Sequence, residues 1–158
     1  MSNFLSIVKS CPLFLELYDD EVMKIVEKCH VTSLEKNEFI FREGDKGDEL
    51  YIIMSGSVHV EKNKVNLATL KKGDLFGELV LINDNIRSAD IICDNFTDLL
   101  IMNYSDIFGL YNTEPKIFSI IMLNLTRLLT KRLKNSSNTI KELNMRIQLL
   151  ENETKNVA

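Results

Sequence analysis

The most informative segment of the chain is Phe76-Gly77-Glu78-Leu79-Val80-Leu81, which is followed, after five further residues, by Arg87-Ser88-Ala89. Gly77 has no side chain, so a ligand can approach the backbone closely at this position. The apolar residues after it fit one short helical turn, whose free N–H groups attract an anion. Glu78 can accept hydrogen bonds from sugar hydroxyls, and Arg87 offers a planar fork of donors that fits a phosphate. These residue types predict a site for a small phosphorylated ligand such as a nucleotide, and they include no catalytic group.

Taken alone, a glycine–glutamate turn and a later arginine can also be a surface turn with a surface ion pair, since short motifs often occur by chance. The longer pattern Phe-Gly-Glu-Leu-x-Leu-x5-Arg-Ser-Ala resembles the phosphate-binding cassette of cyclic nucleotide-binding domains. Residues 40–56, Ile-Phe-Arg-Glu-Gly-Asp-Lys-Gly-Asp-Glu-Leu-Tyr-Ile-Ile-Met-Ser-Gly, resemble the first signature of the same family. Both motifs occur in the family's order, and the resemblance extends from about residue 10 to about residue 140.

This resemblance implies how a cyclic nucleotide is held by the cassette. Arg87 and the backbone N–H groups of the turn would bind the cyclic phosphate, and Glu78 would bind the ribose 2′-hydroxyl. Ser88 would add a contact to the phosphate. The ligand-binding residues implied within the cassette are Gly77, Glu78, Leu79, Val80, Arg87 and Ser88.

Two residues near the cassette depart from the family's pattern. Val80 stands where Ala, Gly or Ser is usual, and Asp90 would repel a phosphate if its side chain faced the site. A second hypothesis is therefore a dimeric protein-interaction module with a degenerate pocket, and a third is a receptor for another nucleotide second messenger such as cyclic di-GMP. An enzyme is the least favoured class, because no nucleophile–base pair is visible. His30 and His59 have no further ligands at metal spacing, so no metal or haem is expected.

Composition indicates an ordinary globular protein. The 158 residues are enough for one domain with a hydrophobic core, and the net charge of −4 gives no support for nucleic-acid binding by the whole chain. Cys11, Cys29 and Cys93 lack metal or redox spacing, which indicates buried thiols in a reducing compartment. No apolar run is long enough to span a bilayer, and the N-terminus has no basic signal-peptide region. We therefore expect a cytoplasmic protein without membrane insertion.

Short apolar segments separated by turn residues occupy the middle of the chain and predict an antiparallel sandwich or barrel. The expected strands are 38–41, 50–54, 57–60, 65–70, 88–93 and 99–102. The family resemblance narrows this prediction to a mainly β fold with flanking helices, in which the strands form a jelly-roll-like antiparallel β-roll. We expect corners with positive φ at Gly44, Gly47, Gly56 and Gly73.

Helices are expected on both sides of the β-roll. Before it, Pro12 separates two helical segments; Asp19 or Asp20 is expected to cap the second, and His30 to end it. These helices and the β-roll make up the first predicted domain, residues 1–114.

The second predicted domain, residues 115–158, is one long C-terminal helix. Pro115 suits its first turn and Thr113 its cap, and no Gly or Pro interrupts residues 116–151. Such a helix is roughly 50 Å long at 1.5 Å per residue. The part near residues 117–129 is expected to pack on the chain's own β-roll, whereas the distal part needs another partner.

The distal part carries a heptad seam that predicts dimerisation. Its positions, spaced alternately by three and four residues, are Leu133, Ser136, Ile140, Leu143, Ile147 and Leu150. Identical seams match in register, so a parallel homodimer through this helix is the simplest arrangement. The helix also resembles the dimer helix of the catabolite activator class of the family, in which a Thr-Ser pair meets the adenine of cyclic AMP. Ser136 and Ser137 are the matching residues, although serines here can also have only a structural place in the seam.

These observations favour a stand-alone cyclic nucleotide sensor, with cyclic AMP preferred over cyclic GMP. The long helix would close over the base, reset the dimer and signal to a separate effector protein that the sequence does not identify. The catabolite activator class continues into a helix-turn-helix domain, whereas this chain ends at Ala158. Direct DNA binding is therefore not expected, and no cofactor other than the nucleotide ligand is implied.

Overall fold

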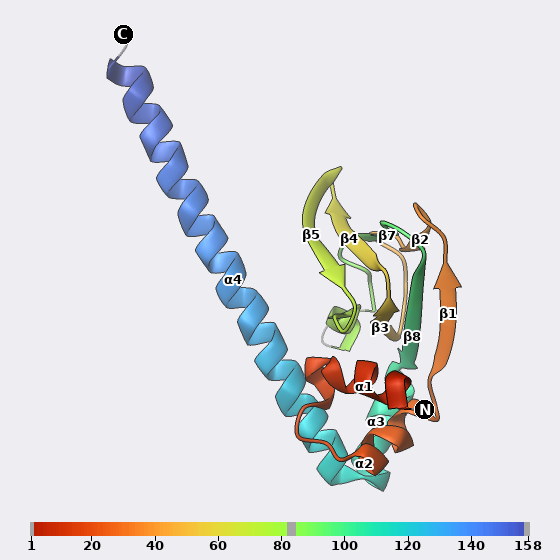
Figure 1. Ribbon diagram of the computed structural model, residues 1–158. Coiled ribbons are helices and arrows are strands. Elements are labelled where there is room, and N and C mark those ends of the chain that lie inside the picture. The colour runs from red at the N-terminus through yellow and green to blue at the C-terminus, as the bar shows by residue number, and fades with distance from the viewer. Residues whose placement is uncertain (1, 82–84, 157–158) are drawn as a thin grey trace. The chain divides into compact units, whose positions relative to one another are not determined.

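The structure is a computed structural model that describes residues 2–81 and 85–156 (Figure 1). For residues 2, 3, 80, 81 and 153–156 it describes the backbone only. The chain divides into two compact units, residues 1–124 and residues 125–158, and each is considered by itself.

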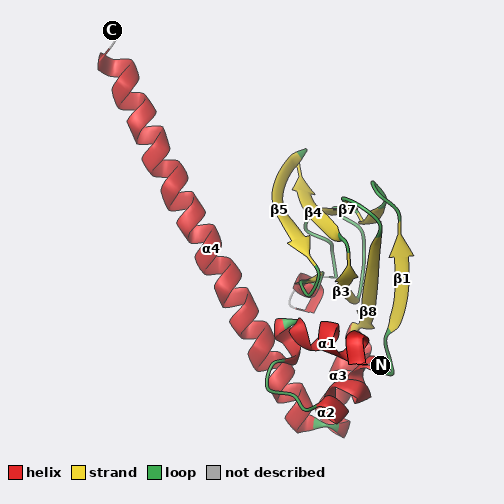
Figure 2. Ribbon diagram, viewed as in Figure 1, coloured by secondary structure: helices red, strands yellow, loops and turns green. Residues whose placement is uncertain are grey.

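The first unit begins and ends with helices that flank a β-region (Figure 2). The helices before it are α1 (Ser2–Ser10), η1 (Pro12–Phe14) and α2 (Asp19–Val26), and those after it are α3 (Tyr104–Thr113) and the start of α4 (Pro115–Asn156). The strands found in the described residues are β1 (His30–Leu34), β2 (Phe39–Phe41), β3 (Glu49–Ser55), β4 (Ser57–Lys62), β5 (Val65–Lys71), β6 (Leu75–Phe76), β7 (Asp90–Cys93) and β8 (Thr97–Asn103). A short 3-10 helix, η2 (Glu78–Leu81), follows β6.

Within the described part of the chain, the strands form two antiparallel sheets, in the orders β1-β8-β3-β6 and β2-β7-β4-β5. Side chains from both sheets make one buried apolar cluster. Its members are Tyr51, Ile53, Val58, Phe76, Ile91, Cys93, Leu99 and Ile101. The antiparallel β-roll with flanking helices and a long C-terminal helix, as predicted, is confirmed.

Strand β3 is buried on both faces, which explains its nearly continuous apolar sequence. Tyr51 and Ile53 belong to the apolar cluster between the sheets. Leu50 and Ile52 point to the opposite face because side chains alternate along a strand, and both are fully buried. Helix α1 contacts β3, and α3 contacts β8, the strand that directly precedes it.

Two strands were not predicted. Strand β1 is largely exposed and has no alternating apolar residues, yet it pairs with β8 along its whole length. Strand β6 has only two residues and pairs with β3. The prediction that His30 ends a helix was wrong, because His30 is the first residue of β1.

The start of α2 also differs from its prediction. The N-cap residue is Tyr18, and its backbone N–H donates to the carboxylate of Glu21 at 2.9 Å. A glutamate three residues into a helix satisfies the N-cap backbone donor in this way. Asp19 and Asp20 therefore lie inside the first turn, and the prediction that one of them is the cap was wrong.

The glycines at corners are as predicted in three cases out of four. Gly44, Gly56 and Gly73 have φ of +86°, +82° and +89°, in the left-handed region that L-residues with side chains rarely adopt. Gly47 does not have a positive φ. Its need for glycine has a different origin, described below.

Helix α4 runs from Pro115 to Asn156, close to the predicted limits. The predicted cap was wrong, because Thr113 is still part of α3 and its hydroxyl donates to the carbonyl of Gly109. From residue 125 onward the helix forms the second unit. No helix in the described ranges is both long and apolar enough to cross a membrane.

Candidate functional site

The two sequence motifs meet in the first unit through backbone hydrogen bonds. The N–H of Arg87 donates to the carbonyl of Asp45 at 2.8 Å, and the N–H of Gly44 donates to the carbonyl of Arg87 at 2.9 Å. A further bond of 3.0 Å joins the N–H of Gly47 to the carbonyl of Asn85. The loop after β2 therefore holds the backbone of the cassette arginine in place.

The side chain of Arg87 is buried, with 3% of its surface exposed. Its Nη1 donates to the carbonyl of Glu49 at 2.9 Å and approaches the carbonyl of Gly77 at 3.4 Å. Its Nε has no hydrogen-bond partner among the described residues. Arg87 also makes no ion pair with any carboxylate in the part of the chain that the structure describes.

Aromatic rings line the buried guanidinium. Its Cζ lies 4.2 Å from the ring centroid of Phe41 and 5.4 Å from that of Tyr51. The ring of Tyr51 stacks on Phe76, with a centroid separation of 5.1 Å. The hydroxyl of Tyr51 donates to the carboxylate of Glu49. Strands β2 and β3 thus supply the rings next to Arg87, and the Phe76 ring of β6 packs behind Tyr51.

Two glycines leave the space that the guanidinium occupies. Gly77 has φ of +80°, and a Cβ there would lie 2.9 Å from Nη1 of Arg87 and 2.9 Å from the carbonyl of Glu49. A Cβ at Gly47 would collide with the guanidinium from another side. Gly47 is therefore a glycine because of close packing rather than backbone conformation.

Burial governs the electrostatics of this site. It lowers the pKa of Arg87, while Tyr51, Glu49 and two nearby aspartates oppose that shift. Burial and the hydrogen bond to Glu49 raise the pKa of Tyr51. Arginine still keeps its proton at neutral pH because its ordinary pKa is so high. The result is a desolvated positive charge that makes no ion pair with a described carboxylate, which is an arrangement that attracts an anion.

The remaining cassette residues surround the turn after β6. Glu78 is buried, with 4% of its surface exposed, whereas Leu79 is 45% exposed. The backbone of Val80 belongs to η2, and its side chain lies outside what the structure describes. Whether Val80 crowds a ligand therefore stays a prediction.

Asp90 and Ser88, which follow Arg87, both make hydrogen bonds to neighbouring segments. The carboxylate of Asp90 accepts a hydrogen bond of 2.6 Å from the backbone N–H of Glu43, so this interaction fixes it to the neighbouring loop. Ser88 is exposed, and its carbonyl accepts a hydrogen bond from Lys62 at 2.9 Å. The predicted contact between the Ser88 side chain and a phosphate stays a prediction.

The other two predicted ligand residues, Ser136 and Ser137, lie on α4 in the second unit. Both side chains are exposed. Their predicted contact with a nucleotide base stays a prediction.

A model of the family described as "Cyclic nucleotide-binding domain" matches residues 31–114. This range is more than half of the chain. The chain belongs to the cyclic nucleotide-binding domain family. The matched range includes the complete surroundings of Arg87: the loop after β2, the rings of β2, β3 and β6, and the cassette.

The chain is similar in sequence and in structure to known proteins that contain this domain. The chain is 38% identical over 91 residues to a cGMP-dependent protein kinase of Plasmodium berghei, covering 58% of this chain but only 11% of that kinase. The structure of a cyclic nucleotide-binding domain from Methylobacillus flagellatus KT has a TM-score of 0.78 and 28% identity, over 88% of this chain and 81% of that one. The Thermus thermophilus catabolite activator protein has a TM-score of 0.72 and 30% identity, over 84% of this chain and 62% of that one.

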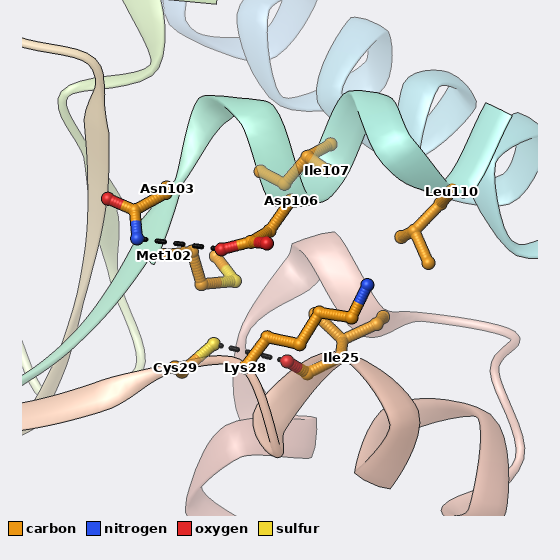
Figure 3. A pocket seen from close by; sticks show the side chains of 8 residues that line it. All are labelled: Ile25, Lys28, Cys29, Met102, Asn103, Asp106, Ile107 and Leu110. Atoms are coloured by element: carbon orange, nitrogen blue, oxygen red, sulfur yellow. Dashed lines mark hydrogen bonds between the residues drawn. The ribbon is translucent and has the colours of Figure 1, made fainter.

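A separate small pocket lies between α2 and α3, away from the cassette in sequence (Figure 3). It is lined by Ile25, Lys28, Cys29, Met102, Asn103, Asp106, Ile107 and Leu110. The thiol of Cys29 donates to the carbonyl of Ile25, and burial raises its pKa to about 12. A thiol that keeps its proton is a poor nucleophile, so Cys29 is not an activated cysteine. No group of three or more metal-ligating side chains occurs among the described residues.

Sequence reasoning missed four residues that shape the site: Phe41, Gly47, Glu49 and Tyr51. All four lie in the first signature motif, residues 40–56. That motif served only to identify the family, because no spacing rule connects a strand residue to an arginine about forty positions later. The alternation of β3, which places Tyr51 inside the roll, was the one available signal.

Proposed function

We propose that this domain binds a cyclic nucleotide and that Arg87 holds the cyclic phosphate. The observation that carries this proposal is the buried guanidinium with an unpartnered Nε and no ion pair among the described residues. An isolated buried charge is unfavourable, and an anionic ligand that accepts a hydrogen bond from it removes that cost. A phosphate diester supplies one negative charge together with acceptor oxygens.

The remaining contacts follow from the cassette. The backbone N–H groups of Glu78, Leu79 and Val80, with the close approach allowed at Gly77, would complete the phosphate site. The buried carboxylate of Glu78 would accept a hydrogen bond from the ribose 2′-hydroxyl. Ser88 would add a phosphate contact.

We further propose cyclic AMP as the preferred ligand, on the basis of Ser136 and Ser137. A hydroxyl can both donate and accept, which suits the amino and ring-nitrogen edge of adenine. The similar kinase from Plasmodium berghei is named for cGMP. The preference for adenine over guanine is therefore tested by titration with both cyclic AMP and cyclic GMP.

The proposed role is that of a regulatory sensor without catalysis of its own. Ligand binding would shift the population of two conformations, the C-terminal helix would mediate a homodimer, and a separate effector protein would respond. Cys11, Cys29 and Cys93 are all free thiols, which supports a reducing, cytoplasmic location.

Calorimetric titration of the 158-residue chain with cyclic AMP, cyclic GMP and cyclic di-GMP tests this function. Arg87→Leu should cost roughly 2–5 kcal/mol of binding free energy, which is about 30-fold to several thousand-fold in affinity. Arg42→Leu is a matched control, because Arg42 also packs on a phenylalanine but is exposed. The site assignment is wrong if folded Arg87→Leu keeps the wild-type affinity. Absence of binding by all three nucleotides would instead favour an interaction module with a degenerate pocket.

A further inference from the structure

The aromatic rings beside Arg87 are not part of the ligand contacts described above. Phe41 is half-buried, and its ring lies 5.7 Å from Tyr51 and 6.0 Å from Phe76, measured between centroids. Tyr51 and Phe76 belong to the apolar cluster between the sheets, and Phe41 packs against that cluster. The three rings therefore form one continuous cluster, and the guanidinium lies against two of its members, Phe41 and Tyr51.

The contact between Phe41 and Arg87 restricts the orientation of the guanidinium. A cation is attracted to the face of an aromatic ring within about 6 Å of its centroid, and the attraction is larger when water is excluded. Here the separation is 4.2 Å, and the arginine is buried. The hydrogen bond from Nη1 to the Glu49 carbonyl fixes a second point of the same group.

Two contacts from two strands thus determine how Arg87 lies. Strand β2 supplies the ring of Phe41, and strand β3 supplies the carbonyl of Glu49. Neither contact occupies Nε, which is the donor left without a partner among the described residues. The ring on one face and the hydrogen bond at Nη1 together oppose rotation of the planar guanidinium, and such a rotation would move Nε from its present position.

We propose that Phe41 is a positioning residue, whose ring holds the Arg87 guanidinium so that Nε stays available for the phosphate of the ligand. This inference rests on the proposed function and extends it to a residue outside the cassette. A role of Phe41 in packing alone makes a different prediction. In that case its loss lowers the stability of the domain but leaves the guanidinium and the affinity unchanged.

The chain offers a closely matched control. Phe39 lies on the same strand as Phe41, and its ring centroid lies 3.5 Å from Cζ of Arg42. Phe39→Leu removes the same number of atoms and the same kind of contact, but at an arginine that is exposed. Phe41→Tyr keeps an aromatic face and serves as the conservative variant.

The first measurement uses the ligand-free protein. In a ¹H–¹⁵N spectrum of arginine side chains, the Nε–H of Arg87 should give a slowly exchanging, ring-shifted signal, assigned by its absence in Arg87→Lys. We expect this signal in wild type, Phe41→Tyr and Phe39→Leu, and its loss in Phe41→Leu. If Phe41→Leu keeps the signal, Phe41 does not position Arg87 and the proposal is overturned.

The second measurement is calorimetric titration of the same variants with cyclic AMP and cyclic GMP. Phe41→Leu should bind at least tenfold more weakly than wild type, while Phe41→Tyr and Phe39→Leu stay within threefold. Thermal unfolding of each ligand-free variant shows that the fold is retained. Equal affinity of Phe41→Leu and wild type overturns the positioning role. Absence of binding by wild type overturns the proposed function, and the ligand-free spectrum still reports separately whether Phe41 holds the guanidinium.

Discussion

A Cβ atom at Gly47 would lie 2.4 Å from Nε of Arg87 and 2.4 Å from its Nη2. These distances are far shorter than any van der Waals contact, so no side chain fits at position 47 while the guanidinium keeps its place. Gly47 and Arg87 are forty residues apart in the sequence, and the loop–cassette hydrogen bonds bring them together. The observed position of the Arg87 guanidinium thus requires a glycine that lies outside the cassette.

Gly47→Ala should displace the guanidinium and weaken cyclic nucleotide binding by at least about tenfold, roughly 1.4 kcal/mol. The φ of Gly47 is not positive, so the alanine introduces little backbone strain and the domain should remain folded. Calorimetric titration with cyclic AMP checks the affinity. Gly109→Ala is the control, because a Cβ there meets nothing within 4 Å and Gly109 lies inside α3. Equal affinities of both variants would show that Arg87 does not need this space.

Replacing Ser136 and Ser137 together with alanine should reduce the preference for cyclic AMP. Each hydroxyl that bonds the base contributes about 0.5–1.5 kcal/mol, so the loss is roughly twofold to tenfold per serine. Cyclic GMP affinity should change less, which narrows the ratio between the two ligands. Ser119→Ala, in the same helix, is the control because its hydroxyl donates to the carbonyl of Pro115. An unchanged ratio in the double variant would remove these serines from the site.

The C-terminal helix should make the chain a homodimer. The apolar seam residues are more than half exposed in the single chain: Leu133, Ile140, Leu143, Ile147 and Leu150. Burying each contributes about 1.5–3 kcal/mol before the cost of association, enough for a dimer at micromolar concentration. Sedimentation equilibrium, with and without cyclic AMP, measures this state.

The double variant Ile140→Glu and Ile147→Glu places charges in the seam and should be monomeric. Asn138→Glu with Asn152→Glu adds the same charge on the other side of the helix and should remain dimeric. A monomeric wild-type chain under both ligand conditions would contradict the dimer prediction. The prediction would also be contradicted if both double variants formed the dimer as readily as each other.

The free energy of unfolding at acidic pH should depend on the carboxylate of Asp98. Its carboxylate accepts hydrogen bonds from Ser33 at 2.6 Å and Ser55 at 2.7 Å, which lower its pKa below the ordinary 3.8. Because the folded pKa is depressed, this stabilisation is complete above the unfolded pKa and is lost as the pH falls through the folded pKa. Ser33→Ala with Ser55→Ala should cost about 1 kcal/mol at pH 7.

That difference between wild type and the double serine variant should shrink below pH 3.8, the ordinary pKa of this group. Urea unfolding at pH 7, 4 and 3 measures it. Ser105→Ala removes an exposed serine of α3 and should show no pH-dependent difference. A cost for the double variant that stays constant across these pH values would mean that Asp98 is not the group responsible.

Local signals in the sequence predicted most of the strands and the long C-terminal helix, whereas the β-roll and the cassette were predicted from the resemblance to the family. Turn residues and alternating apolar residues marked most strands, and Pro115 marked the start of α4. Strand β1 gave no such signal, since its register comes from pairing with β8 rather than from its own residues. The residues of the site that were not predicted also depend on contacts between distant parts of the chain. Gly47 and Phe41 matter only through Arg87, and such a contact is a property of the folded chain.

The collision between a side chain at position 47 and the guanidinium also limits how the domain can evolve. Under the proposed function, a mutation at Gly47 is selected against while Arg87 is needed for the ligand, because a side chain at position 47 would displace the guanidinium. In a descendant that no longer binds nucleotide, Arg87 can be lost first, and position 47 then becomes free to accept a side chain. The two positions should therefore change in that order, so a relative that keeps the glycine but has lost the arginine records an early stage in the decay of a pocket.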